Sequence, residues 1–91
     1  MAVIDAVAKE LHMEPKELLK ESLKGYLEKR LSKVEADIFL LVKKYGVKDV
    51  LEMDAKVKKG LISEKDAYDD YFTLDNLEAE REKIKRILEK I

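Results

Sequence analysis

The sequence predicts an all-α fold: a long antiparallel helical hairpin of residues 16–45 and 63–91, with short helices at about 2–12 and 48–59. Three observations support this prediction. Apolar residues recur at helical spacing between residues 27 and 45, the two long segments are nearly equal in length, and proline or glycine separates the segments. A chain of 91 residues is long enough for one domain, which we take to be residues 1–91.

The first segment, residues 2–12, is a short amphipathic helix in this prediction. Ile4, Val7, Ala8 and Leu11 fall on one face of such a helix. Pro15 disfavours helical geometry in the residue before it and suits the first turn of a helix. The second helix is therefore expected to begin at about residue 16.

The second helix carries the main apolar row, which we call the seam. Its members follow one another at steps of three or four residues: Leu27, Leu31, Val34, Ile38, Leu41 and Tyr45. Residues 38–42 are all apolar, so we expect this turn to be covered on more than one side. Gly46 accepts the left-handed conformation that ends helices.

Two further helices follow. Asp49 with Glu52 suggests a capped helix start and Gly60 a helix end, which predicts the third helix. Its apolar edge is expected to cover residues 38–42 and consists of Val50, Met53, Val57 and Leu61. Ser63 with Asp66 is a second capping pair and opens a final helix that we extend to Ile91.

The two long helices are expected to pair along nearly their whole lengths, about 45 Å and about 43 Å. The predicted antiparallel register brings Leu41 near Tyr71, Ile38 near Leu74, and Leu27 near Ile84. Arg81 interrupts the apolar row of the final helix and falls opposite Leu31. We therefore expect Arg81 to form an ion pair with Glu28 or Glu35.

Composition argues against several classes of protein. Without cysteine there is no disulfide, thiolate metal site or cysteine nucleophile. The serines have no recognisable base beside them, no glycine-rich phosphate loop is present, and His12 is the only histidine. We expect a protein that is not an enzyme and that has no cofactor, no metal site and no catalytic residue.

Charge and hydropathy favour a cytoplasmic protein. The net charge is −1, so neither nucleic acid nor an anionic membrane is favoured as a partner. No apolar run approaches the length of a membrane span, and residues 1–13 lack the pattern of a secretory signal. The absence of Gln and the single Asn, Asn76, resemble the composition of hyperthermophile proteins.

An acidic segment interleaved with aromatic residues is the first candidate site. Residues 64–80 hold seven acidic residues and one basic residue, a net charge of −6. Tyr68, Tyr71 and Phe72 are either an aromatic core under the third helix or, with Asp69 and Asp70, a surface that binds a basic protein partner. A weaker alternative is a Mg²⁺ or Ca²⁺ site at Asp66, Asp69 and Asp70.

The second candidate site is a self-association surface. Four leucines lie off the seam and predict a homodimer: Leu18, Leu19, Leu23 and Leu40. The alternative is a small DNA-binding regulator that uses residues 2–27 as a helix-turn-helix, with Lys16, Lys20 and Lys24 facing the DNA.

Three short stretches resemble small, uncharacterised helical proteins of hyperthermophilic archaea, some of which are similar to antitoxins. The stretches are Lys-Lys-Tyr-Gly-Val at 43–47, Lys-Lys-Gly at 58–60 and Asp-Ala-Tyr-Asp-Asp-Tyr-Phe at 66–72. The resemblance implies that Tyr68, Tyr71 and Phe72 bind a partner protein. It also implies that the N-terminal helices form the dimer or DNA-binding end.

Overall fold

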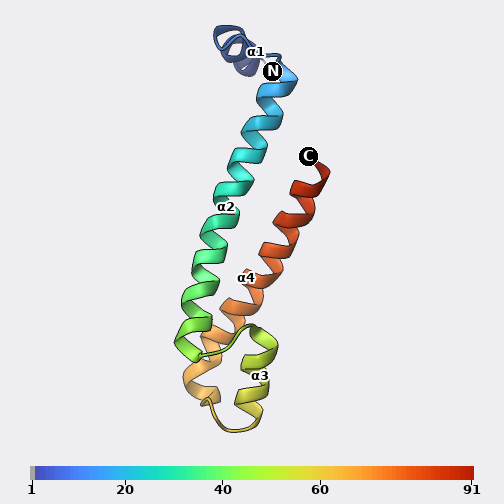
Figure 1. The fold of residues 1–91 in the computed structure, drawn as a ribbon. Coiled ribbons are helices and arrows are strands. Elements are labelled where there is room, and N and C mark those ends of the chain that lie inside the picture. The colour runs from blue at the N-terminus through green and yellow to red at the C-terminus, as the bar shows by residue number, and fades with distance from the viewer. Residues whose placement is uncertain (1) are drawn as a thin grey trace.

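The computed structural model describes residues 2–91 and confirms the all-α hairpin (Figure 1). Its helices are α1 (Ala2–Glu10), α2 (Pro15–Tyr45), α3 (Val50–Lys58) and α4 (Glu64–Lys90). Each boundary lies within a few residues of the prediction. Within residues 2–91 there is no strand, and none of the helices has the length and apolar character needed to cross a membrane.

The helices begin and end at the predicted residues because local side chains satisfy their free backbone groups. At the start of α3, the carboxylate of Asp49 accepts a hydrogen bond from the backbone N–H of Glu52 at 2.8 Å. At the start of α4, the hydroxyl of Ser63 accepts one from the backbone N–H of Asp66 at 3.4 Å. Gly46 ends α2 with a φ of 63°, a conformation that glycine adopts without strain.

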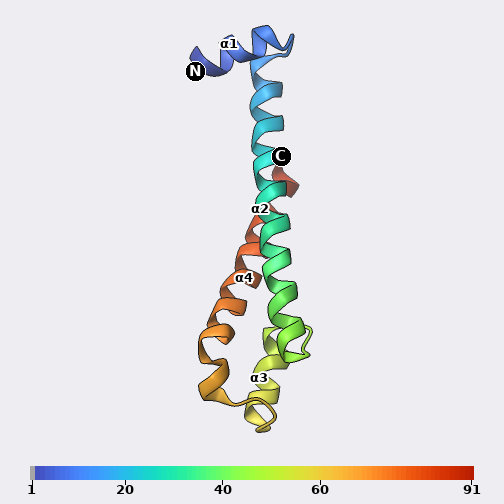
Figure 2. The same cartoon turned by 90° about the vertical axis from the view of Figure 1, so that its left-hand side faces the viewer.

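Helix α1 lies across the first turns of α2 at a steep angle (Figure 2). The turn between them contains His12, whose φ of 57° is in the left-handed region. This turn lets the backbone N–H of Met13 donate to the carbonyl of Ala8 at 2.9 Å. Ala8 is fully buried, so α1 is held against α2 at a small side chain that permits close approach.

Helices α2 and α4 run antiparallel, side by side, in the predicted register (Figures 1 and 2). Two ion pairs join them: Arg30 to Glu80, with 2.6 Å between Nη2 and Oε1, and Lys44 to Asp70, with 2.7 Å between Nζ and Oδ2. In each pair, the residue on α4 lies within two positions of the residue that the predicted register places opposite its partner on α2.

Arg81 has a different ion-pair partner in the structure from the one expected. Its Nε lies 3.3 Å from Oε1 of Glu82 on its own helix, and neither Glu28 nor Glu35 pairs with it. Each of these two glutamates directly follows a seam residue, which places it about 100° round α2 and leaves it exposed. The prediction was wrong because it matched positions along the helices without considering the direction of the side chains.

The core lies mainly at the closed end of the hairpin, where α2, α3 and α4 meet. Its buried members are Val34, Ile38, Val47, Val50, Met53, Ala67, Leu74 and Ile84. Helix α3 packs mainly against α4 and leaves the outer side of α2 open. The expectation that residues 38–42 are covered on more than one side is therefore wrong for Phe39 and Leu40, which are 60% and 63% exposed. Leu61, expected to help cover them, is also exposed.

The protein is strongly elongated, with extents of 60 × 20 × 18 Å and a radius of gyration of 19.0 Å. A compact domain of this length has a radius of gyration of about 12 Å. Helix α4 ends alongside α2 and short of α1, so α1 and the first turns of α2 project beyond the hairpin (Figures 1 and 2).

Candidate interaction surfaces

At the closed end, Asp70 ties α4 to the last turn of α2. Its Oδ2 accepts hydrogen bonds from Nζ of Lys44 at 2.7 Å and from the hydroxyl of Tyr45. These two hydrogen bonds lower the pKa of Asp70, and hydrogen bonding to Asp70 raises the pKa of Lys44. Burial, followed by the hydrogen bond to Asp70, raises the pKa of Tyr45. Asp70, predicted to bind a partner, therefore has a structural contact within the chain.

We expect Tyr45→Phe to lower the free energy of unfolding by about 1 kcal/mol at pH 7, because the variant lacks one hydrogen bond to a partly buried carboxylate. The pKa of Asp70 is lowered in the folded state, so its stabilisation is complete above the ordinary carboxyl pKa and is lost as the pH falls through the folded value. The difference between variant and wild type should accordingly shrink at pH 3. Urea unfolding at both pH values measures it.

Tyr68→Phe is the matched control, because Tyr68 is 59% exposed, makes no hydrogen bond through its side chain among residues 2–91, and keeps its ring contact with Phe72 when the hydroxyl is removed. It should leave the unfolding free energy unchanged within about 0.5 kcal/mol at either pH. An equal loss for Tyr45→Phe at pH 7 and pH 3 would contradict the role assigned to the ionised Asp70.

Helix α3 is anchored to α4 at its first turn and by its core face. The backbone N–H of Val50 donates to Oε2 of Glu78 at 2.8 Å, and Met53 is fully buried. Lys56 also donates from Nζ to the carbonyl of Gly46 at 2.9 Å. These contacts hold α3 in one position beside α4, so the walls of any hollow between them are formed before a partner arrives.

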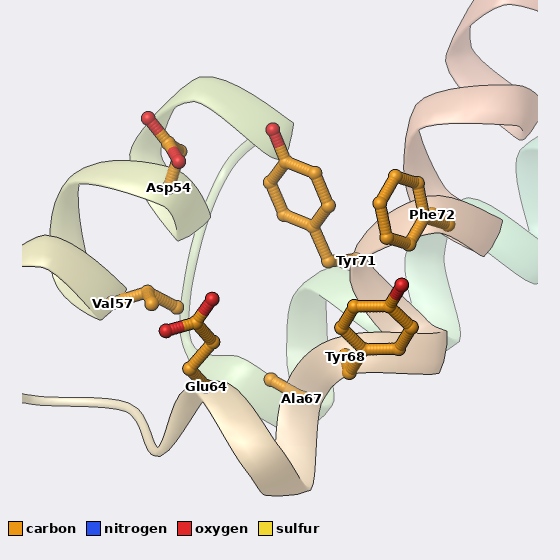
Figure 3. Close-up of a pocket in the computed structure, with 7 residues that line it drawn as sticks. All are labelled: Asp54, Val57, Glu64, Ala67, Tyr68, Tyr71 and Phe72. Atoms are coloured by element: carbon orange, nitrogen blue, oxygen red, sulfur yellow. The ribbon is translucent and has the colours of Figure 1, made fainter.

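Such a hollow lies between α3 and the start of α4, with a volume of about 160 Å³ (Figure 3). Its lining combines aromatic rings, two carboxylates and two small apolar groups: Asp54, Val57, Glu64, Ala67, Tyr68, Tyr71 and Phe72. We call it the aromatic pocket. Figure 3 shows the rings on one side of it and the carboxylates of Asp54 and Glu64 on the side of α3 and the first turn of α4.

The aromatic residues predicted to bind a partner gather at this pocket, yet they do not form a buried core. Tyr68 and Phe72 are 59% and 49% exposed, whereas Tyr71 is partly buried. Phe72 contacts both tyrosines edge to face, with ring centroids 5.1 Å from Tyr68 and 5.4 Å from Tyr71. Asp69 is exposed beside them. The structure therefore agrees better with an accessible aromatic surface than with an aromatic core under α3.

The metal alternative has no geometric support in the part of the chain that the structure describes. Residues 2–91 contain no group of three or more His, Cys, Asp or Glu side chains arranged to hold a metal ion. Of the three acids considered, Asp70 is directed at Lys44 and Tyr45.

The opposite end of the molecule exposes a second surface, which is apolar. Its members come from α1, the turn after it and the first third of α2: Val3, Val7, Leu11, Leu19, Leu23 and Tyr26. We call it the N-terminal apolar surface. Val3 and Val7 line a shallow groove with Leu18 of α2, and Leu19, Leu23 and Tyr26 follow at steps of four and three on one side of that helix.

The structure divides the four leucines predicted for self-association. Leu19 and Leu23 are exposed on the N-terminal apolar surface, and Leu18 lies half-buried beneath α1. Leu40 is exposed as well, but it lies 17 residues after Leu23 on the same helix, about 25 Å away. Leu40 is therefore too far from the other three leucines to lie with them on one compact surface.

Sequence reasoning missed several members of both surfaces. Val3 and Val7 lie four residues apart along one edge of α1, and Leu11 follows at the same step in the turn after that helix. Val7 and Leu11 were recognised as part of the apolar face of an amphipathic helix, whereas Val3 was not. No spacing in the sequence indicated that Asp54 and Glu64 would line one pocket. They lie on different helices, α3 and α4, and the loop at residues 59–63 turns the chain so that both reach the same hollow.

Comparison with known proteins gives a family match. A family model described as the Uncharacterized protein MJ0235 family matches residues 1–91. Searches of curated proteins and of solved structures return no significant match. The family match agrees with the predicted resemblance to small uncharacterised archaeal proteins, and it carries no activity, ligand or partner in its description.

Proposed function

The chain belongs to the uncharacterized MJ0235 family, and from its surfaces we propose that it is a non-enzymatic helical interaction module that self-associates as a homodimer. The observation that carries the proposal is the amount of surface left exposed. The protein exposes 7042 Å². A compact monomer of this mass exposes about 5,500 Å².

This excess of about 1,500 Å² is larger than the area that one chain loses in a dimer interface of standard size. Stable interfaces of standard size bury about 800 Å² on each partner. The large apolar side chains that are at least 40% exposed include the whole N-terminal apolar surface. Exposed apolar patches of this kind mark association sites, since their burial is favourable.

The experiment that tests the proposal is light scattering coupled to size-exclusion chromatography at tens of micromolar protein. The expected mass is twice the chain mass of 10.6 kDa. A mass of one chain at that concentration would contradict the homodimer.

The closed end is the proposed contact for a different, basic protein. Its support is the negative charge of residues 64–80 together with the exposed rings of Tyr68 and Phe72, because aromatic anchors are enriched in protein interfaces. An antitoxin-like role is a specific form of this proposal and derives from the resemblance of residues 66–72. Recovery of the protein from its native cells together with a small basic protein is the expected result.

A DNA-binding regulator is the second candidate function. Lys16, Lys20 and Lys24 are exposed at steps of four residues on α2 and form no ion pair among residues 2–91, so they are available to phosphates. Glu17 and Glu21, between them, oppose this use.

If this second function holds, replacing the three lysines with glutamine should weaken duplex binding uniformly across sequences and reduce its salt dependence. A mobility-shift titration at low salt measures both effects. Absence of any shift with the wild-type protein would remove this candidate.

A further inference from the structure

The aromatic pocket combines features that suit a cationic side chain. The faces of aromatic rings carry negative electrostatic potential and attract cations. Here Tyr68, Tyr71 and Phe72 stand on one side of a hollow, and Glu64 and Asp54 bring carboxylates to it (Figure 3). Val57 and Ala67 complete the lining with apolar groups that can contact the methylene part of a long side chain.

Of the two carboxylates that line the pocket, one is paired within the described residues and one is not. Glu64 forms no ion pair or side-chain hydrogen bond among residues 2–91. Asp54 pairs with Lys58 at 2.9 Å, but the side chain of Lys58 is 76% exposed, and exposed ion pairs contribute little. Residues 64–80 carry a net charge of −6, but they extend along α4 away from the pocket, and Asp70 and Glu80 among them pair with Lys44 and Arg30 of α2. A positive group is therefore the ligand that this environment favours.

The pocket is formed in the free protein. Glu78 holds the first turn of α3, Met53 is fully buried, and Asp70 ties α4 to α2, as described above. The two edge-to-face contacts limit the positions of Phe72 relative to its neighbours. A ligand would therefore not have to order these walls, and this raises the affinity obtainable from a small contact.

We propose that the aromatic pocket binds an arginine side chain presented by a basic segment of a partner protein. A volume of about 160 Å³ has room for one such side chain. A guanidinium group stacks on an aromatic face and offers paired N–H donors to a carboxylate, whereas an ammonium group is a more strongly hydrated point charge. Glu64 is the carboxylate assigned to the guanidinium. This inference rests on one part of the proposed function, namely that the closed end contacts another protein.

The test is an NMR titration of the ¹⁵N-labelled full chain with three short peptides that differ at one residue: arginine, lysine or citrulline. Citrulline has nearly the shape of arginine without its charge. We expect saturable shifts of the amide signals of Ala67, Tyr68 and Tyr71 with the arginine peptide. Binding should be weaker with lysine and at least about tenfold weaker with citrulline. Equal binding of arginine and citrulline, or tighter binding of lysine, would overturn the assignment.

Two single-charge variants separate the pocket from general attraction to acidic protein. Glu64→Gln should weaken the arginine peptide about tenfold. Asp75→Asn removes the same charge from an exposed position on α4 outside the pocket and should change the affinity less than twofold. Equal effects of the two variants would overturn the proposal. Tyr68→Leu, at an exposed ring, should also weaken binding while leaving the helix content unchanged.

Failure of this proposal and failure of the homodimer are distinguishable. The dimer is measured by light scattering and is placed at the N-terminal apolar surface, at the other end of the hairpin from the aromatic pocket. A monomeric protein that still selects arginine over citrulline would leave the pocket assignment intact. A dimer without that selectivity would refute the pocket assignment alone.

Discussion

Leu74→Ala is expected to lower the free energy of unfolding by about 3 kcal/mol. Leu74 is fully buried in the core between α2 and α4. Removing its methyl groups loses the favourable free energy of burying them. It also leaves a cavity, which closes only in part because neighbouring contacts hold the helices in place. The core has few buried side chains, so no adjacent cluster compensates for the loss. Urea unfolding followed by circular dichroism, at a fixed protein concentration, measures the effect.

Leu51→Ala is the matched control, because it makes the same chemical change in α3 at a side chain that is 77% exposed. We expect it to change the unfolding free energy by less than about 0.5 kcal/mol. Similar losses for the two variants would mean that the interface between α2 and α4 is not the main source of stability.

The helices and their ends could be predicted because their determinants are local in sequence. The Asp49 cap, the Ser63 cap and the left-handed Gly46 each depend on residues within one turn of the helix end. The seam from Leu27 to Tyr45 could be predicted from the helical spacing of its apolar residues alone, and it lies against α4 as expected. The antiparallel register followed from the lengths of the two helices and the short connection between them.

The faces that the helices present to one another were harder to predict. Helix α3 is short, and its apolar edge can pack on α2 or on α4 with little difference in the sequence pattern. In the structure, the hydrogen bond from the backbone N–H of Val50 to Glu78 holds α3 against α4. As a result, Phe39, Leu40 and Leu61 remain exposed. This contact joins residues 28 positions apart in the chain. One sequence, without the fold, does not reveal such a contact.

The candidate sites also divide into features set by neighbouring residues in the sequence and features set by packing between helices. Tyr68, Tyr71 and Phe72 are close in sequence, so they were recognised together as a candidate surface. The role of Asp70 within the chain and the position of Asp54 beside Glu64 depend on how α2 and α3 pack against α4. The sequence therefore identified the aromatic part of the site and left its carboxylates unassigned.

Replacing Leu19 and Leu23 together with glutamate is expected to weaken the proposed homodimer at least about 100-fold. Both side chains are exposed in the isolated chain, at 40% and 47%, so the variant should keep its helix content. In a two-fold symmetric dimer each substitution occurs twice, and four carboxylates would then have to lose water and approach one another. Sedimentation equilibrium gives the dissociation constants of variant and wild type.

The control for that experiment is Leu51→Glu with Leu61→Glu, which adds the same charge at two exposed leucines near the closed end. It should leave the dissociation constant within about threefold of the wild type, because screened charges far from an interface contribute little. If the control pair dissociates the dimer and the Leu19 and Leu23 pair does not, self-association belongs to the closed end. In that case the N-terminal apolar surface would be left for a different partner.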